Sequence, residues 1–361
     1  MIANLPDFPW DTLADAGAKA RAHQDGVVDL SVGTPIDPVP QVIQEALTGA
    51  AWIPGYPTTH GTPALREAAV AALARRHGVT VPVEAVLPTI GSKELVAWLP
   101  TLLGVGAGDL VVIPSLAYPT YEVGARLAGA EVLRADSTVA VGPARPSVVW
   151  LNSPSNPTGK VLPPEHLRKV VEWARARGTI VVSDECYLTL GWEAEPVSVL
   201  HPSVSGDTHD GVLAVHSLSK SSSLAGYRAG YVTGDPKLVS ALLAVRKHAG
   251  MIVPHPVQAA MTAALSDDTH VAEQKSRFAG RREVLRPALE AAGFTIESSE
   301  AGLYLWSTRN EDAWTTVDWL ATRGILVAPG TFYGPTGHKH VRIALTATDE
   351  RIEAAAKRLT S

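Results

Sequence analysis

From residue 85 onward, apolar runs of strand length alternate with segments of helical periodicity. The runs are almost continuous in apolar residues, as is typical of strands in a largely parallel sheet that helices cover on both faces. The pattern therefore predicts a doubly wound α/β domain. The predicted strands cover 86–90, 110–113, 147–151, 180–183, 213–216 and 231–233, and the first helices between them cover 92–103, 118–128 and 164–177.

The two ends of the chain predict a smaller α+β unit. Near the N-terminus, a helix over 10–24 precedes a strand over 27–32, which Gly33-Thr34-Pro35 ends. A helix over 268–292 is long enough to bridge two domains, and short strands and helices follow it to residue 359. We expect a large domain over 40–270 and a small domain made of 1–39 and 271–361. Further helices are predicted at 40–47, 63–77, 236–249 and 256–266, with a loop over 54–63.

Composition and charge limit the class of partner. The chain has 361 residues, 46% of them hydrophobic and 19% charged, and a net charge of -5 without any basic block. We therefore expect small-molecule partners, and no nucleic acid. A single cysteine, Cys186, permits no internal disulfide and indicates a reducing compartment. The chain begins without a basic and apolar signal segment and has no run of eighteen apolar residues, which predicts a cytoplasmic location and no membrane span.

Lys220 is the first candidate for chemistry, in a run of small and hydroxyl residues that begins at Ser217. A lysine amine forms Schiff bases with aldehydes such as pyridoxal phosphate, and Ser217, Ser219 and Arg228 are suited to holding a phosphate. A solvated loop is the alternative for such a motif taken alone.

Asp184 ends a predicted strand and precedes Tyr187 by three residues. Ligands of such sheets collect where strands end, and an aspartate there can keep a pyridine nitrogen protonated. A helix cap is the alternative. Asn156 lies in a Pro- and Gly-rich turn after the strand over 147–151, from which its amide, together with Tyr187, can bond a ring hydroxyl.

Other strand ends add weaker candidates. Gly91-Ser92-Lys93 precedes a helix, and free N–H groups at such a helix start can bind a phosphate. The Lys93 side chain is expected to be solvated in the first helical turn. Tyr118 follows the strand over 110–113 and can stack on a flat ring, although core packing is the alternative. The glycine-rich segment 104–109 precedes a strand, so we discount it as a dinucleotide loop.

Arg342 lies in an otherwise apolar predicted strand over 340–345. A buried arginine needs an acidic partner, which is either a substrate carboxylate or a protein carboxylate. The nearby His338 and His340 have no acidic or cysteine companions at metal-ligand spacing, so no metal site is predicted.

Taken together, these motifs resemble the class I/II pyridoxal-phosphate-dependent aminotransferases of fold type I over nearly the whole chain. Asp184 follows Asn156 by 28 residues, Lys220 follows Asp184 by 36, and Arg228 follows Lys220 by 8, which is the order and approximate spacing of that family. The resemblance implies a large domain with a mostly parallel sheet covered by helices, a smaller α+β domain, and pyridoxal 5'-phosphate as cofactor.

The resemblance also assigns roles. Lys220 would bind the cofactor as a Schiff base and then carry the proton, and Asp184 would pair with the ring nitrogen. The substrate carboxylate would be received by Arg342, Asn156 and the turn at Gly33. Tyr56 matches a tyrosine that reaches the phosphate of the neighbouring subunit, which implies a homodimer with shared active sites. The other implied cofactor contacts are Ser92, Lys93, Tyr118, Asn156, Tyr187, Ser217, Ser219 and Arg228.

At finer grain the chain is similar to the actinobacterial N-succinyldiaminopimelate aminotransferases. The segments that carry this likeness are 5–11, 29–35, 91–94, 246–251 and 344–350, and Ser221-Ser222-Ser223 departs from it, because a basic residue and an asparagine are expected after the lysine. The implied reaction exchanges an amino group between glutamate and N-succinyl-2-amino-6-oxopimelate in lysine and diaminopimelate biosynthesis. An N-acetylated or other acceptor, a pyridoxal-phosphate-dependent lyase or decarboxylase, and a non-catalytic module remain alternatives. Charge alone suggests Arg66, Arg246 and Lys247 for the distal carboxylate, with a surface or interface position as the alternative.

Overall fold

A seven-stranded mixed sheet forms the core of the larger part of the computed structural model, which describes residues 5–360. The strand order is β2-β8-β7-β6-β5-β3-β4, and only β8 (Ala229–Gly234) runs antiparallel to its neighbours. The largely parallel sheet predicted from the apolar runs is therefore confirmed. The other strands are β2 (Val86–Ile90), β3 (Leu110–Ile113), β4 (Glu131–Arg134), β5 (Val148–Asn152), β6 (Ile180–Asp184) and β7 (Val212–Ser217).

Helices cover both faces of this sheet, which explains the continuous apolar runs. In β5, Val149 and Leu151 belong to one hydrophobic cluster, whereas Val148 and Trp150 belong to another. The first cluster includes residues of α2 (Gln41–Gly49), α3 (Pro63–His77), α7 (Pro164–Arg175) and α11 (His255–Ser266), and the second includes residues of α4 (Gly91–Leu102), α5 (Thr120–Ala128) and α10 (Pro236–Ala249). Short helices α6 (Thr138–Val141), α8 (Pro202–Ser205) and α9 (Leu218–Ser221) lie in the connections.

A four-stranded antiparallel sheet forms the smaller unit, in the order β12-β13-β10-β9. A third hydrophobic cluster joins it to the N-terminal segment, since Leu13 and Val28 pack with Phe278, Val317 and Ile352. The residues 1–4 and 361 of the predicted small domain lie outside the described part, and the domain boundaries stay a prediction. The elements are 3-10 helix Pro9–Leu13, α1 (Ala14–Arg21), β1 (Val28–Asp29), β9 (Thr295–Glu297), β10 (Tyr304–Thr308), α13 (Ala313–Thr322), β11 (Ile325–Leu326), β12 (Ala328–Pro329), β13 (His340–Ala344) and α14 (Asp349–Thr360), with short 3-10 turns at Gly330–Phe332 and Pro335–Gly337.

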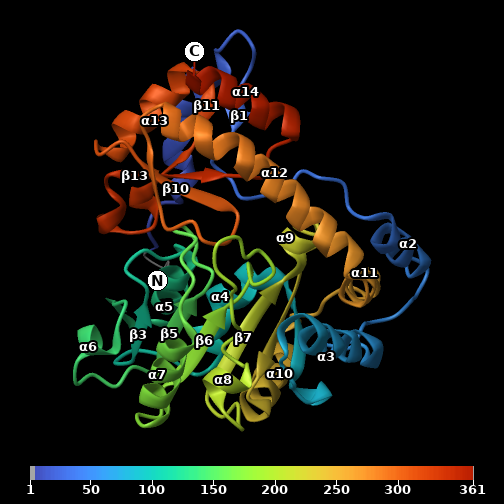
Figure 1. Ribbon diagram of the computed structural model, residues 1–361. Coiled ribbons are helices and arrows are strands. Elements are labelled where there is room, and N and C mark those ends of the chain that lie inside the picture. The colour runs from blue at the N-terminus through green and yellow to red at the C-terminus, as the bar shows by residue number, and fades with distance from the viewer. Residues whose placement is uncertain (1–4, 361) are drawn as a thin grey trace.

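Helix α12 (Thr269–Ala291) runs from the larger sheet to the smaller one (Figure 1). It starts beside α9 and α11 and ends beside α14, as the long predicted helix suggested. Across residues 5–360, no helix is both long and apolar enough to cross a membrane, and no group of three or more His, Cys, Asp or Glu side chains is placed to hold a metal ion.

Three details of the predicted elements differ from the structure. The edge strand β4 was not predicted, because its Glu-Val-Leu-Arg sequence has charged ends and no buried residue. The strand predicted over 27–32 is only Val28–Asp29. Strand β8 extends beyond the predicted 231–233, because Ala229, Gly230 and Gly234 carry little apolar side chain to signal a strand.

Arg246 is fully buried, so the surface or interface position considered for it is wrong. Its guanidinium bonds both carboxylate oxygens of Glu94 in α4, with Nη1 to Oε1 at 2.8 Å and Nη2 to Oε2 at 3.2 Å. The ion pair ties α10 to the start of α4. Lys247, the next residue, is exposed.

We expect Arg246→Ala to destabilise the protein by about 2–3 kcal/mol, because the Glu94 carboxylate loses its partner. The expected loss is smaller than for a fully buried ion pair, because the Glu94 carboxylate is partly exposed. Lys247→Ala is the matched control and should change the free energy of unfolding by less than about 0.5 kcal/mol. Urea unfolding followed by tryptophan fluorescence measures both. Equal stability of the two variants would show that the ion pair contributes nothing net.

Candidate active site

A cavity of about 620 Å³ collects nearly all the residues that the sequence singled out. Tyr56 is the exception: it does not line this cavity, and its side chain is 95% exposed. The cavity therefore brings together residues from both ends of the chain. The predicted residues in its wall are Gly33, Ser92, Lys93, Tyr118, Asn156, Asp184, Tyr187, Ser217, Ser219, Lys220, Arg228 and Arg342.

Parallel strand pairing places the central residues side by side. Asp184 is the last residue of β6 and is in register with Asn152 at the end of β5 and with Val215 in β7. Because the carboxyl ends of parallel strands meet at one edge of the sheet, the loops after β5, β6 and β7 all open into the same space. Lys220 lies in α9, directly after β7.

The Lys220 amine points to the N-terminal segment and donates a hydrogen bond to the Gly33 carbonyl oxygen. Burial lowers the pKa of Lys220, and the nearby positive charge of Arg342 lowers it further. A lysine in such surroundings holds its proton less tightly than an exposed one, which favours nucleophilic and general-base chemistry at neutral pH.

Two donors hold the Asp184 carboxylate. The Tyr121 hydroxyl donates to Oδ2 at 2.8 Å, and the Cys186 backbone N–H donates to Oδ1 at 3.2 Å. Burial raises the pKa of Asp184, and these hydrogen bonds and the charge of Lys220 oppose that rise. A bound cation beside the carboxylate would favour its ionised form still more.

At the start of α4, Gly91 and Arg228 approach each other closely. Gly91 has φ +71°, and a Cβ placed on it would lie 2.4 Å from Arg228 Nη2. Ser92 and Lys93 follow in the first helical turn, where backbone N–H groups have no helical partner. Neither Arg228 nor Lys93 forms an ion pair within residues 5–360. This end of the cavity is suited to a dianion such as a phosphate.

Lys93 is an exposed residue, as expected for a first helical turn, but it also faces the cavity. Its Nζ lies 5.2 Å from the centre of the Phe8 ring, and the residue lines the cavity. Burial, together with the charge of Arg228, lowers the pKa of Lys93.

Arg342 is buried in β13 without an acidic partner anywhere in residues 5–360. Its Nη1 donates to Asn156 Oδ1 at 2.9 Å and its Nη2 to the Ser31 carbonyl oxygen at 2.6 Å, while Nε has no partner. The guanidinium lies 3.9 Å from the centre of the Tyr304 ring. Of the two partners considered for this arginine, the protein carboxylate is absent from the described part, so its charge is left for a ligand.

The two tyrosines in the middle of the cavity contact each other. The hydroxyls of Tyr187 and Tyr304 are 3.1 Å apart, and burial raises the pKa of Tyr187 well above its ordinary value, so it stays a neutral donor. Tyr304 also presses on the N-terminal segment, since a Cβ on Gly33 would meet its hydroxyl at 2.0 Å. Burial raises the pKa of Tyr118 to about 12.

The sequence did not assign several residues of the cavity wall. Tyr121 lies three residues after Tyr118 and could have been found from helical periodicity, because i and i+3 share a face. Asn152 holds the turn after β5 by donating to the Asp184 carbonyl oxygen at 2.9 Å and by accepting from the Asn156 N–H at 2.7 Å. Phe8, Trp10 and Tyr304 had no local signal, since only the tertiary fold brings them here.

Comparison with known proteins identifies one family that covers nearly the whole chain. A family model described as "Aminotransferase class I and II" matches residues 25–359. A protein named as a probable aminotransferase of Mycobacterium tuberculosis is 68% identical over 99% of this chain and 86% of its own length. The 4-dedimethylamino-4-oxo-anhydrotetracycline transaminase OxyQ of Streptomyces rimosus is 60% identical, over 99% of this chain and all of its own length.

Solved structures agree with the family match. A probable N-succinyldiaminopimelate aminotransferase of Thermus thermophilus superposes with a TM-score of 0.88 at 29% identity, and the match covers 98% of this chain and 99% of that one. The architecture is that of the fold type I aminotransferases, as the family resemblance implied.

Proposed function

The chain belongs to the class I and II aminotransferase family, and from that premise we propose that it exchanges an amino group between glutamate and N-succinyl-2-amino-6-oxopimelate. The product would be N-succinyl-LL-2,6-diaminopimelate, an intermediate of lysine and diaminopimelate biosynthesis. The observation that carries the proposal is the cavity that Lys220, Asp184 and Arg342 line together. Arg342 has no acidic partner in the described part of the chain.

Pyridoxal 5'-phosphate is the cofactor of this family, and the cavity fits it. Its phosphate suits the end formed by Ser92, Lys93, Ser217, Ser219 and Arg228, where two cations have no acidic partner within residues 5–360. Its ring nitrogen suits the buried carboxylate of Asp184, and its aldehyde suits the Lys220 amine. Asn156 and Tyr187 are placed for the ring hydroxyl, and Tyr118 for the ring face.

When bound, the cofactor supplies the electron sink that stabilises negative charge on the substrate α-carbon. In our proposal the Lys220 amine would take the proton from that carbon and hold it beside the substrate, because burial favours the neutral amine. Asp184 keeps the ring nitrogen protonated throughout. Arg342, with Asn156 and Gly33, holds the substrate α-carboxylate so that the α-hydrogen faces the Lys220 amine.

Arg342→Lys should raise KM for glutamate by about 10- to 100-fold with a smaller change in kcat, because one of two charged hydrogen bonds to the carboxylate is lost. Steady-state kinetics at varied glutamate concentration measure the two constants. Arg323→Lys is the control, since Arg323 stacks on Trp319 at 3.7 Å outside the cavity. Unchanged KM in Arg342→Lys would remove Arg342 from the carboxylate site.

The choice of acceptor is supported by the sequence likeness to N-succinyldiaminopimelate aminotransferases and by the Thermus thermophilus structure of that name. None of Arg66, Arg246 and Lys247 lines the cavity, so the charge-based candidates for the distal carboxylate have no structural support. Lys93 is one of the cations in the cavity wall, and its ammonium group lies beside the Phe8 ring.

A second candidate acceptor is a ketone on a fused ring system. The 60% identity to OxyQ favours it, as does the aromatic wall that Phe8, Trp10 and Tyr118 contribute to the cavity. Flat rings stack well on such side chains.

An amino-donor comparison tests the proposal. With 2-oxoglutarate as acceptor, glutamate formation is measured from N-succinyl-LL-2,6-diaminopimelate, its N-acetyl analogue and an amine on a fused ring system. We expect kcat/KM for the succinyl compound to exceed the others by at least about tenfold. A higher value for either competitor would overturn the acceptor assignment, and elimination or decarboxylation products would overturn the reaction type.

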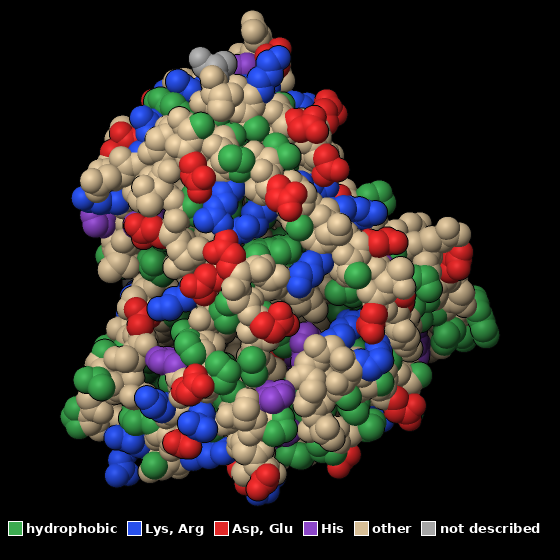
Figure 2. Space-filling view, in the orientation of Figure 1, with side chains coloured by type: hydrophobic (Ala, Val, Ile, Leu, Met, Phe, Trp, Pro, Cys, Tyr) green, Lys and Arg blue, Asp and Glu red, His purple; other side chains and the backbone are tan. Residues whose placement is uncertain are grey.

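The shared homodimeric site and the cytoplasmic location stay predictions. Figure 2 shows hydrophobic side chains gathered at the edge of the molecule beside α2. Trp52 and Tyr56 in the loop after α2 are 78% and 95% exposed, as a segment that reaches a neighbouring subunit requires.

A further inference from the structure

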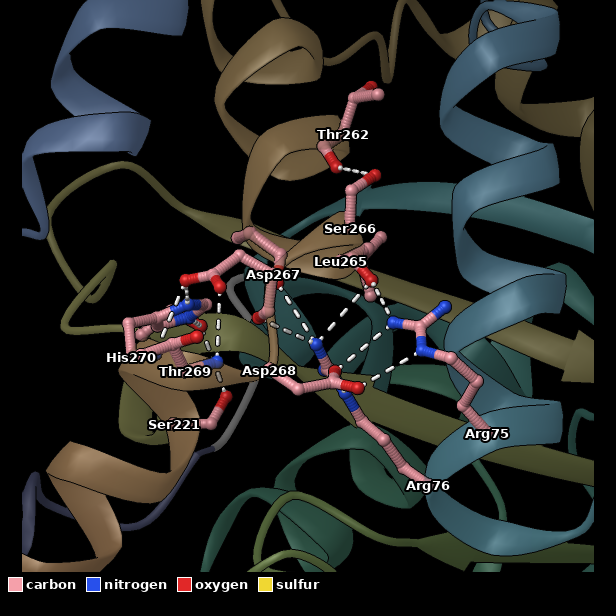
Figure 3. Close-up of polar contacts among 12 residues, drawn as sticks. Arg75, Arg76, Ser221, Thr262, Leu265, Ser266, Asp267, Asp268, Thr269 and His270 are labelled. Atoms are coloured by element: carbon pink, nitrogen blue, oxygen red, sulfur yellow. Dashed lines mark hydrogen bonds and ion pairs between the residues drawn. The ribbon is translucent and has the colours of Figure 1, made fainter.

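Ser222, two residues after Lys220, takes part in a chain of hydrogen bonds that leads to α12. Its Oγ lies 2.9 Å from His270 Nε2, and His270 Nδ1 lies 2.8 Å from Asp267 Oδ2. Asp267 also accepts the backbone N–H groups of Thr269 and His270, so it fixes the first turn of the helix (Figure 3). Burial raises the pKa of Asp267 and these hydrogen bonds lower it, to about 2, so the carboxylate is ionised and orients the His270 ring.

The order of groups matches that of a serine nucleophile with its base and orienting acid. Ser222, however, is only 1% exposed, and its backbone N–H is bonded to the Leu218 carbonyl oxygen. A substrate carbonyl has no access to the hydroxyl, so the chain of hydrogen bonds serves position and not nucleophilic attack.

The backbone next to these hydrogen bonds is strained. Ser223, next to Ser222, has φ +55°, and Arg228 at the end of the same loop has φ +56°. Residues other than glycine keep such angles only where neighbouring contacts enforce them. The hydrogen bond between Ser222 and His270 lies directly before Ser223, the first of the two strained residues.

The same helix holds the other partner of Lys220. The Lys220 amine bonds the Gly33 carbonyl, and four residues later Asp37 accepts from Gln274 at 2.8 Å and from Arg281 Nη1 at 2.9 Å. Both donors belong to α12. The lysine loop and the segment that receives its amine are therefore anchored to one rigid element.

We propose that Ser222, His270 and Asp267 are positioning residues that fix Lys220 for proton transfer, by tying the strained turn after it to the helix that also holds the Gly33 segment. The inference rests on the proton-transfer role proposed for Lys220. It also gives a use to Ser222, one of the three serines that follow the lysine.

The test compares Ser222→Ala with Ser222→Thr, which keeps the hydroxyl, and with Asp268→Asn. Asp268 is the matched control, since it lies beside Asp267 and pairs with Arg75 and Arg76 of α3 (Figure 3). Within residues 5–360, no hydrogen bond or ion pair joins Asp268 to Ser222. Single-turnover reaction of the cofactor-loaded proteins with glutamate and with α-deuterated glutamate gives the rate and the isotope effect. Amide hydrogen exchange of segment 217–224 gives a readout independent of activity.

Ser222→Ala should slow the reaction about 10- to 100-fold, increase the isotope effect and leave the apparent Kd for glutamate within about twofold, because a misplaced amine slows only the proton transfer. Exchange in 217–224 should speed up, and Ser222→Thr should restore both readouts. Asp268→Asn should lower the melting temperature and leave the isotope effect unchanged.

Parent-like rate, isotope effect and exchange in Ser222→Ala would overturn the proposal, and so would equal losses in Ser222→Ala and Asp268→Asn with no rise in the isotope effect. Should Ser222→Ala fail to fold, His270→Gln carries the same expectation. Because glutamate is the only substrate used, an error in the proposed acceptor does not affect this test. A parent protein that fails to react with glutamate would instead contradict the donor of the proposed function, and hydrogen exchange would then decide the anchoring.

Discussion

Lys220→Ala is expected to lower kcat for transamination by about 10⁴-fold or more, the upper end of what a positioned general base contributes. The variant should also lose the visible absorbance of the lysine-bound cofactor, because no other lysine in the cavity wall lies at the end of β7. Lys93, the second lysine of the wall, lies in the first turn of α4 and contributes to the phosphate site in our proposal. Steady-state assays with glutamate and absorbance spectra of the purified protein measure both effects.

Lys237→Ala is the control for this substitution, since that side chain is 87% exposed and pairs only at 3.9 Å with Asp210. It should keep parent-like spectra and turnover. If Lys220→Ala retained the cofactor spectrum and normal turnover, the assignment of the reactive lysine would be wrong. A Lys220→Ala protein that binds the cofactor without turnover would agree with the assignment of Lys220, since the proposed phosphate contacts do not involve the lysine amine.

Asp184→Asn should lower kcat by at least about 10³-fold, because a neutral amide cannot keep the ring nitrogen of the cofactor protonated in a buried site. The amide keeps the size of the carboxylate, its oxygen can accept from the Cys186 backbone N–H and its NH2 group can donate to the Tyr121 hydroxyl, so the effect on folding should be small. Rapid-mixing measurements with glutamate report the loss, and the melting temperature checks the fold.

Two variants calibrate this result. Tyr121→Phe removes one hydrogen bond to Asp184 and should cost far less than the loss of the charge, about tenfold. Asp210→Asn changes an acid whose side chain is 64% exposed and should have no effect. Full activity of Asp184→Asn would mean that the ring nitrogen does not need an anionic partner in this protein.

Much of the sheet and the centre of the site could be predicted from local sequence. The apolar runs correspond to strands buried on both faces. Asp184 ends one of these strands, and α9, which contains Lys220, begins directly after another. The edge strand β4 escaped because it is neither buried nor apolar at its ends. The surface or interface position predicted for Arg246 was also wrong, because nothing near it in the sequence reveals its partner Glu94, which lies 152 residues away.

The family could be read from the sequence alone, and so could two candidate site residues, Lys220 and the acid at the end of β6, because strand ends of a parallel sheet share one edge whatever the loops do. The partners of the polar side chains, in contrast, became known only from the three-dimensional structure. Arg342 reaches Ser31 across 311 positions, Lys220 reaches Gly33 across 187, and Ser222 reaches His270 across 48. Such partners depend on how the two sheets and α12 pack, and side-chain periodicity carries no record of that packing.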